Sequence, residues 1–525
     1  MPSTAEAQLR HANYYLAKLE EFGRRFKQRG QVNPRMLAEM DDEWPQIVSG
    51  IEWATREADG EHQFDAPVLR ICSSFSEVAS SLLSLRQNAE DRIRWLRAAL
   101  SAARKVGDRR AEGKHLGNLG IAYEDLGLYE ESIEHLQAAL ATSRELNDPS
   151  SEGVNLGQLG LSHIGTGDYE RAIECLQSAL SIARDLGERS SEGMHLGNLG
   201  LAYGYTGRYD LALEMHIQAL EISREVGDRR AECMDLTNIG VIYYGWSRYG
   251  EAESYFRQAA ALSREIQYKY GEALSTGDLG VIYIDTGRYG EAMELLTRAL
   301  AITREIGDSF GEGMNLANIG LIHEELGDHE KALENYQRAL EMARAGGHRR
   351  GEAKRLGHVG SACGKMGRFQ EAVSHLEEAL RIAQEIGDRE CQCEQLNNLA
   401  AVYTEIGRYE EASLLLLRAL DGSREIGYRL GEADVLGNIG LVLQRQSRYG
   451  EAIARHQQAL DIAREVGDRR NEADQLGHIG DSHCALGEHE MAKKYYRRAR
   501  ESYADIGVHG RAEEIDGKLN RLLIP

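Results

Sequence analysis

The sequence predicts an all-α protein, an α-solenoid of about ten stacked helix pairs. The chain has 525 residues and repeats itself at a 40-residue step, without an insertion, from residue 111 to residue 510. Glycine punctuates most units twice, and no proline lies between Pro149 and Pro525, which suits uninterrupted helices. Self-similarity at such a period is typical of a solenoid, in which every unit packs on its neighbours.

The first helix of each unit is expected to begin after an acidic residue, such as Asp108 or Asp228. A carboxylate there accepts hydrogen bonds from the free N–H groups of the first turn. Apolar residues then recur at helical spacing, as Leu116, Leu119 and Tyr123 do in the first unit. Each unit therefore opens with an amphipathic helix.

A glycine or serine, such as Gly127 or Ser247, ends this first helix. The second helix has its apolar residues on one face, with Leu136 and Leu140 as examples, and most often ends at a glycine such as Gly187. Glycine adopts the left-handed backbone conformation of a helix C-cap without steric cost. We therefore expect a helical hairpin in each unit.

Two columns of small residues predict how the two helices pack. Gly120 recurs in every unit to Gly480, except at Ala400, and Ala172 recurs through Ala492. Glycine inside a helix costs roughly 0.5–1 kcal/mol relative to alanine. Its repetition indicates that the helices of a pair approach each other closely at this position.

The flanks of the array differ from its units. We expect an N-terminal helical arm over residues 1–69 and a degenerate leading repeat over residues 70–110, with its second helix near 91–107. Ten repeats fill residues 111–510, and a capping helix over 511–525 covers the last apolar face.

The repeats resemble the tetratricopeptide repeat. The pattern that carries the resemblance is, in the unit that begins at residue 191, Leu196, Leu199, Gly200, Tyr203, Gly207, Tyr209, Ala212, His216 in place of a leucine, and Ala219. The units are longer than the usual 34 residues of that repeat and lack its closing proline. In this they are similar to kinesin light chains, Pins-type polarity adaptors and the sensor arrays of bacterial STAND ATPases. The resemblance implies a right-handed superhelix of tetratricopeptide (TPR) helix pairs.

Composition narrows the classes of function. The net charge of −22 disfavours nucleic acid as a partner, since acidic chains repel phosphate. No apolar run is long enough to span a membrane, and the first residues lack the pattern of a secretory signal. Seven scattered cysteines do not suggest a disulfide framework. We expect a cytoplasmic protein.

Catalytic motifs are poor, so we predict no enzyme, no cofactor and no metal site. The segment GSACGKMG (360–367) has one residue too few for a phosphate-binding loop, and Met366 stands where Ser or Thr is needed. Cys391 and Cys393 lack a second pair at zinc spacing. Each arginine of the column that begins at Arg144 precedes a glutamate such as Glu152 by eight residues, which predicts inter-helix salt bridges rather than a basic binding stripe.

One polar column on the first helix is a candidate binding surface. It holds asparagine in six units and Gln158, Asp278, His358 and His478 in the others. Asparagine is a poor residue for a helix interior, so its recurrence suggests use. The resemblance implies that this column faces a concave groove, where an amide can pair with the main chain of an extended peptide. The predicted peptide-binding asparagines are Asn118, Asn198, Asn238, Asn318, Asn398 and Asn438.

Four residues before this column, the second to sixth repeats carry an apolar, methionine-rich run: Val154, Met194, Met234, Leu274 and Met314. Outer repeats have charges there, including Asp434 and Asp474. The predicted partner is a protein or peptide, an extended segment with apolar and some basic residues. The alternatives for the two columns are bonds between helices for the amides and ordinary packing for the methionines.

The leading functional hypothesis is therefore a non-enzymatic scaffold or adaptor that holds a partner segment in the groove. The second hypothesis is a ligand- or protein-sensing regulatory region related to STAND-type ATPases and acting in trans. It depends on a resemblance of the N-terminal arm to the connector that joins such ATPase modules to their repeats.

Overall fold

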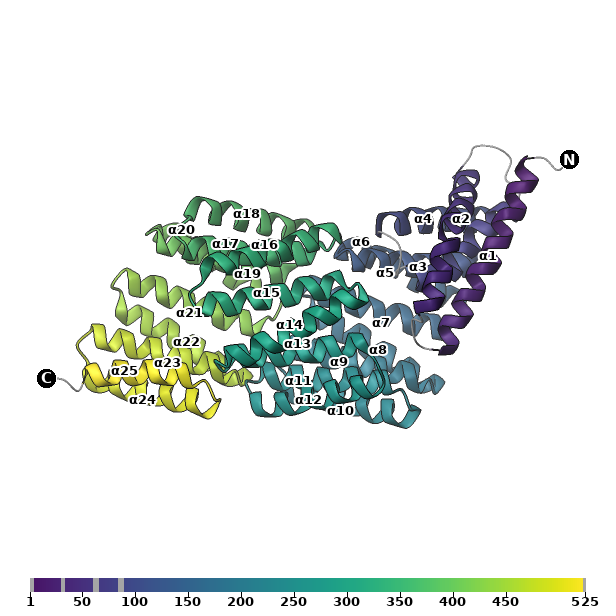
Figure 1. Cartoon of the computed structure of the whole chain (residues 1–525). Coiled ribbons are helices and arrows are strands. Elements are labelled where there is room, and N and C mark those ends of the chain that lie inside the picture. Colours follow the sequence, from purple (N-terminus) through teal and green to yellow (C-terminus); the bar gives the residue numbers. More distant parts are fainter. Residues whose placement is uncertain (1–3, 30–33, 60–65, 84–88, 523–525) are drawn as a thin grey trace. The chain divides into compact units, whose positions relative to one another are not determined.

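The structure is a computed structural model that describes residues 4–29, 34–59, 66–83 and 89–522. All regular elements in these ranges are helices, so the predicted all-α class is confirmed (Figure 1). No described helix is long and apolar enough to cross a membrane. The chain divides into two compact units, residues 1–162 and residues 163–525. The last few residues of α7 lie beyond this division.

The first unit contains four helices before the regular array. They are α1 (Thr4–Arg29), α2 (Pro34–Asp59), α3 (Ala66–Leu83) and α4 (Ala89–Val106). Their buried core includes Phe22, Ile47, Trp53, Phe75 and Trp95. Helix α4 covers the segment predicted as the second helix of a leading repeat. The division into an arm over 1–69 and a leading repeat over 70–110 remains our proposal.

The array itself consists of helical hairpins. Their first helices are α5 (Arg109–Asp125), α7 (Pro149–Thr166), α9 (Arg189–Tyr205), α11 (Arg229–Gly245), α13 (Lys269–Asp285), α15 (Ser309–Glu325), α17 (Arg349–Lys365), α19 (Arg389–Glu405), α21 (Arg429–Arg445) and α23 (Arg469–Ala485). Their second helices are α6 (Tyr129–Glu145), α8 (Tyr169–Leu186), α10 (Tyr209–Val226), α12 (Tyr249–Glu265), α14 (Tyr289–Ile306), α16 (His329–Ala345), α18 (Phe369–Glu385), α20 (Tyr409–Glu425), α22 (Tyr449–Val466) and α24 (His489–Asp505). A final helix, α25 (His509–Arg521), packs on α24.

The predicted caps are present. Asp108 and Asp228 accept hydrogen bonds from backbone N–H groups of the first turns of α5 and α11. Gly187 and Gly227 have positive φ of 68° and 74° and cap α8 and α10 in the left-handed conformation. Ser247 adopts the same conformation, with φ 53°, at a turn where other units have glycine.

The glycine column marks the closest approach of the two helices of a pair. A Cβ atom added at Gly120 would lie 2.5 Å from Leu136 Cγ, and one at Gly240 would lie 2.6 Å from Phe256 Cε1. Distances under 3 Å are far inside van der Waals contact, so any larger residue would push the helices apart. This confirms the predicted reason for the column.

The second unit closes into slightly more than one superhelical turn, which the 40-residue period does not reveal. The turns inside the early hairpins, near residues 167, 207 and 247, pack against the hairpin ends of the later repeats. A Cβ atom at Gly207 would lie 2.9 Å from Val466 Cγ1, and Ser247 Oγ lies 3.3 Å from Asp468 Oδ1. Segments well over 200 residues apart are thus direct neighbours, and 221 positions separate Ser247 from Asp468.

Candidate functional site

The first helices of successive repeats contact one another directly, as α17 does α19 and α19 does α21. Equally extensive contacts between successive second helices do not occur in the part of the chain that the structure describes. The second unit therefore curves with its first helices on the inner side. Residues that face away from the second helices line this inner surface.

The predicted asparagines are all half-buried on first helices. Asn118 and Val154 line a cavity of about 370 Å³ in the first unit. Asn398 and Asn438 line a second cavity of about 500 Å³, together with Val402 of α19 and Leu441 of α21. The column is thus distributed between the two units.

The middle of the column has free amides. Among the described residues, no hydrogen-bond partner is found for the side chains of Asn198, Asn238 and Asn318. By contrast, Asn438 Nδ2 donates a hydrogen bond to Asn397 Oδ1 at 2.8 Å. A hydrogen bond between helices therefore engages the amide of Asn438, and none is found for these three amides among the described residues.

The apolar run differs in exposure along its length. Met194 is 52% exposed and Val154 is 47% exposed, whereas Met234, Leu274 and Met314 are half-buried. The two exposed members belong to different units. The half-buried side chains pack against their neighbours and still leave part of their surface accessible to a ligand.

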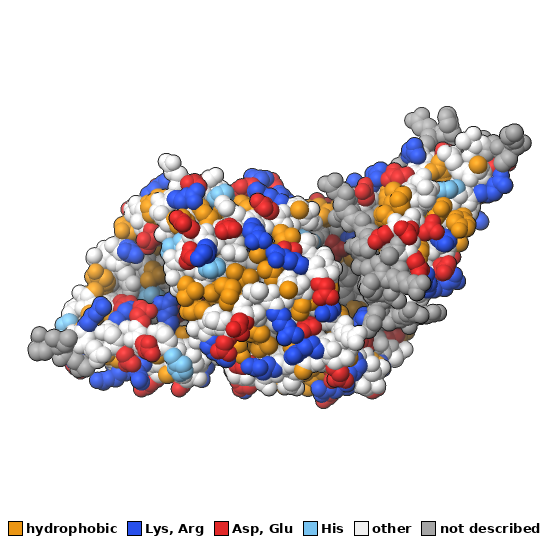
Figure 2. All heavy atoms as spheres, in the orientation of Figure 1, with side chains coloured by type: hydrophobic (Ala, Val, Ile, Leu, Met, Phe, Trp, Pro, Cys, Tyr) orange, Lys and Arg blue, Asp and Glu red, His pale blue; other side chains and the backbone are white. Residues whose placement is uncertain are grey.

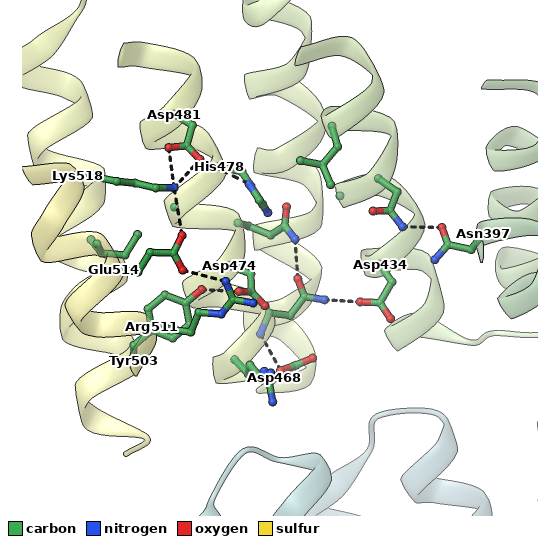
Figure 3. A pocket seen from close by; sticks show the side chains of 18 residues that line it. Asn397, Asp434, Asp468, Asp474, His478, Asp481, Tyr503, Arg511, Glu514 and Lys518 are labelled. Atoms are coloured by element: carbon green, nitrogen blue, oxygen red, sulfur yellow. Dashed lines mark hydrogen bonds and ion pairs between the residues drawn. The ribbon is translucent and has the colours of Figure 1, made fainter. Parts of the chain in front are cut away.

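A third cavity, of about 500 Å³, lies at the C-terminal end of the array (Figure 3). Its walls come from α21, α23 and α25, and Asn438 of the predicted column belongs to its lining. Asp434 and Asp474 stand on α21 and α23, one repeat apart. Figure 3 shows Glu514, Arg511 and Lys518 of α25 opposite them. The cavity is strongly polar.

The basic groups of this C-terminal cavity are already neutralised. Lys518 Nζ lies 3.0 Å from Asp481 Oδ1, and Arg511 Nη1 lies 3.0 Å from Glu514 Oε2. Arg470 forms an ion pair with Asp285, which does not line the cavity.

Asp434 has no cationic partner among the described residues, whereas Arg511 and Arg470 lie close enough to Asp474 to interact with its charge. Asp434 Oδ1 accepts a hydrogen bond from Asn471 Nδ2 at 2.7 Å, and Asp474 accepts one from the Tyr503 hydroxyl. Solvent reaches Asp434, yet the cavity walls remove enough water to raise the pKa of its carboxyl to about 7, and the charges of Asp468 and Asp474 add to this effect. The cavity can therefore accept a cationic group, which would lower this pKa again.

Asp278 replaces asparagine in the column on α13. Burial raises the pKa of its carboxyl to about 7, and its Oδ2 atom has no hydrogen-bond partner among the described residues. The column thus contains a carboxylic acid that changes its charge near neutral pH.

The arginine column is structural, as predicted. Arg144 Nε lies 2.7 Å from Glu152 Oε1, and Arg184 Nε lies 2.8 Å from Glu192 Oε1. Arg264 is an exception, since its Nε donates to the Ala260 carbonyl at 3.0 Å. These guanidinium groups link the end of one hairpin to the start of the next.

Sequence reasoning missed the opposite wall of the C-terminal cavity. Asp434 and Asp474 are recognisable in the sequence as charges in the column before the asparagines, but Arg511, Glu514 and Lys518 lie outside the repeat pattern. No group of three or more His, Cys, Asp or Glu side chains suited to a metal ion occurs among the described residues. The GSACGKMG segment (360–367) forms the end of α17 and the turn after it, and its Lys365 pairs with Glu324 Oε1 at 2.5 Å.

Among curated proteins, none matches the chain. Similar solved structures include a Rap protein complexed with competence and sporulation factor, at 16% identity over 79% of this chain and 98% of that chain, with a TM-score of 0.48. Aspartyl phosphate phosphatase F from Bacillus subtilis is 14% identical over 82% and 96% of the two chains, with a TM-score of 0.42. The apo form of the quorum sensor NprR from B. thuringiensis is 16% identical over 67% and 98%, with a TM-score of 0.41.

A family model described as tetratricopeptide repeat matches five segments of the chain: residues 112–185, 191–265, 271–345, 353–425 and 431–505. Each segment spans two of the 40-residue units, and together they cover more than half of the sequence. The hairpins, the glycine column and the inner position of the first helices agree with this match. The chain belongs to the tetratricopeptide repeat family.

Proposed function

We propose that this protein is an adaptor that holds an extended segment of a partner protein along the inner surface of its superhelix. The observation that carries the proposal is the set of half-buried amides of Asn198, Asn238 and Asn318, which lack partners among the described residues. An amide offers one acceptor and two donor hydrogens, which match the N–H and C=O groups of a peptide unit. Placed on successive or alternate repeats, such amides bind main chain without regard to side chains.

The side-chain preference of the site follows from its other groups. Met194, Met234 and Met314 give an adaptable apolar surface beside the amides. The carboxylates of Asp434 and Asp474, of which Asp434 has no cationic partner among the described residues, favour an ammonium or guanidinium group at the C-terminal end. The proposed ligand is an extended peptide with apolar residues in its middle and a lysine or arginine toward one end.

A displayed library of short random peptides tests this proposal. We expect selection on the full chain to enrich peptides that combine apolar and basic residues. The affinity of a selected peptide should fall by about tenfold or more in the triple variant Asn198→Ala, Asn238→Ala, Asn318→Ala, because each lost hydrogen bond is worth about 0.5–1.5 kcal/mol.

The matched control is Asn335→Ala. Asn335 lies on the second helix α16, where its side chain donates to the Lys331 carbonyl at 2.8 Å. This variant should bind the peptide as the unaltered chain does, and all variants should keep their far-ultraviolet circular dichroism. Equal affinity of the triple variant and the unaltered chain refutes the groove assignment.

A further inference from the structure

Two apolar edges of the second unit are covered in one part of the superhelix and uncovered in another. The first, which we call the loop edge, consists of the last residues of the second helices. Val226 and Ile306 are 42% and 38% exposed, whereas Val466 of the same column is 5% exposed. Leu186 is exposed, as Val226 is, and Ile426 and Ile506 are buried, as Val466 is.

The second edge, which we call the turn edge, consists of the residues around the turn inside each hairpin. Tyr169, Tyr209 and Tyr249 of this edge are buried, whereas from residue 289 onward the same column is half-buried or exposed. One position before the turn glycine, Thr206 is 8% exposed and Leu326 is 60% exposed. Figure 2 shows apolar side chains gathered over α15, the helix that Leu326 caps.

The covered parts of the two edges cover each other. Val466 of the loop edge packs against Gly207 of the turn edge, and Ile426 packs in the same way against Gly167, where an added Cβ atom would lie 3.2 Å from Ile426 Cδ1. The uncovered parts are the turn edge that follows residue 287 and the loop edge that precedes residue 310. In the part of the chain that the structure describes, these residues are half-buried or exposed.

We propose that the free turn edge of one copy binds the free loop edge of a second copy of this chain, so that the superhelix continues from copy to copy. The contact inside one chain identifies the second copy as the partner. Each free edge corresponds, one or more repeats along the chain, to an edge that already packs against the other kind of edge within the same chain. A second copy brings the same columns of the repeat at the same 40-residue spacing. This inference does not depend on the proposed peptide-binding function.

The proposed contact joins two different surfaces, which makes it heterologous rather than two-fold symmetric. Every added copy leaves one free edge of each kind at the ends of the assembly, so growth does not stop at a dimer. This property distinguishes the proposal from a symmetric dimer, and it can be tested by blocking one edge at a time.

Each edge can be blocked by lysines at exposed helix ends, where a positive charge is compatible with the helix dipole. The turn-edge variant is Leu326→Lys with Leu486→Lys, which replaces residues that cap α15 and α23. The loop-edge variant is Val226→Lys with Ile306→Lys, at the ends of α10 and α14. The matched control, Leu414→Lys with Leu417→Lys, alters two leucines in the middle of α20 that are 63% and 51% exposed.

Sedimentation of the full chain over a concentration series, in about 0.15 M salt to screen the acidic surface, tests the proposal. We expect the weight-average mass of the unaltered chain and of the control to rise above 58.5 kDa without a plateau at two chains. Each edge variant alone should stay at 58.5 kDa, with its association weakened by at least about tenfold. An equal mixture of the two edge variants should form a complex of two chains and nothing larger, since it has one intact edge of each kind.

A mass of 58.5 kDa for the unaltered chain at every concentration would overturn the proposal. So would self-association of either edge variant at the strength of the unaltered chain, because that result requires a contact through other surfaces. Circular dichroism of all variants confirms that they are folded.

Discussion

The hydroxyl of Tyr169 donates a hydrogen bond to Glu390 Oε2 at 3.0 Å, although 221 residues separate the two in sequence. Glu390 also lies 3.1 Å from Arg350 Nη2, and the ring of Tyr169 stacks on Tyr205 at 5.3 Å. This cluster closes the superhelical turn of the second unit. Its residues come from four different hairpins, and together they fix how the early repeats meet the later ones.

Replacing Tyr169 with phenylalanine tests how much this closure stabilises the protein. Tyr169→Phe removes the hydroxyl and leaves the ring, so we expect a loss of about 1.5–3 kcal/mol, typical of a hydrogen bond to a charged group. Tyr409→Phe is the control, since Tyr409 occupies the same column on the uncovered edge and should change stability by less than about 0.5 kcal/mol. Urea unfolding followed by circular dichroism measures both. Equal effects would show that the closure contributes nothing.

The comparison of Tyr169 with Tyr409 also shows what the sequence could and could not predict. The hairpins, their caps and the glycine column follow from local spacing, because each depends on residues within one or two units. Tyr169 and Tyr409 have nearly the same local sequence, yet one is buried and the other half-buried. Their difference arises from the pitch of the superhelix, which is the sum of small rotations between repeats and leaves no local signal.

The candidate site likewise has one part that the sequence predicts and one part that it does not. The asparagine column was visible because it recurs every 40 residues on the first helix. The C-terminal cavity was not, because Arg511, Glu514 and Lys518 belong to α25, which lies beyond the ten repeats and carries side chains that do not recur in them. Their approach to Asp474 and Asp481 depends on how the last hairpin is capped.

The glycine column allows a stability test with a built-in control. Gly240→Ala places a methyl group 2.6 Å from Phe256 Cε1, and we expect a destabilisation of about 1–3 kcal/mol from overpacking. Gly250→Ala, in the first turn of α12, meets no atom within 4 Å and should stabilise the protein by about 0.4–1 kcal/mol. The urea midpoints of the two variants should therefore move in opposite directions. Two shifts of the same sign would contradict the packing described for this column.

The pH dependence of stability should report on Asp278. Burial raises the pKa of this carboxyl to about 7, so the folded state binds its proton more tightly than the unfolded chain. The stabilisation is complete below the unfolded pKa, near about 4, and is lost as the pH rises through about 7. Asp278→Asn removes the ionisable carboxyl and with it this pH dependence. The variant should therefore be more stable than the unaltered chain at about pH 8, with a smaller difference at about pH 5. Thermal unfolding at the two pH values measures it, and an unchanged pH profile would contradict the prediction.

The carboxylates of the C-terminal cavity should bind a positively charged side chain of the peptide. Asp434→Asn with Asp474→Asn should weaken binding of a selected lysine-containing peptide by about tenfold and reduce its salt dependence. The control, Asp421→Asn with Asp461→Asn, makes the same change in net charge at exposed positions of α20 and α22. Replacing the peptide lysine with glutamine should abolish the difference between the two double variants. A similar loss of affinity in both variants would indicate long-range attraction rather than a site.

Photo-crosslinking tests the central claim, a partner segment on the inner surface, most directly. A photoreactive amino acid replaces Met314 on the first helix α15 in one variant and Leu414 on the second helix α20 in another. With a peptide selected on the unaltered chain, we predict covalent attachment at position 314, abolished by excess unlabelled peptide, and none at position 414. Attachment at position 414 alone, or at both positions to the same extent, would contradict the account.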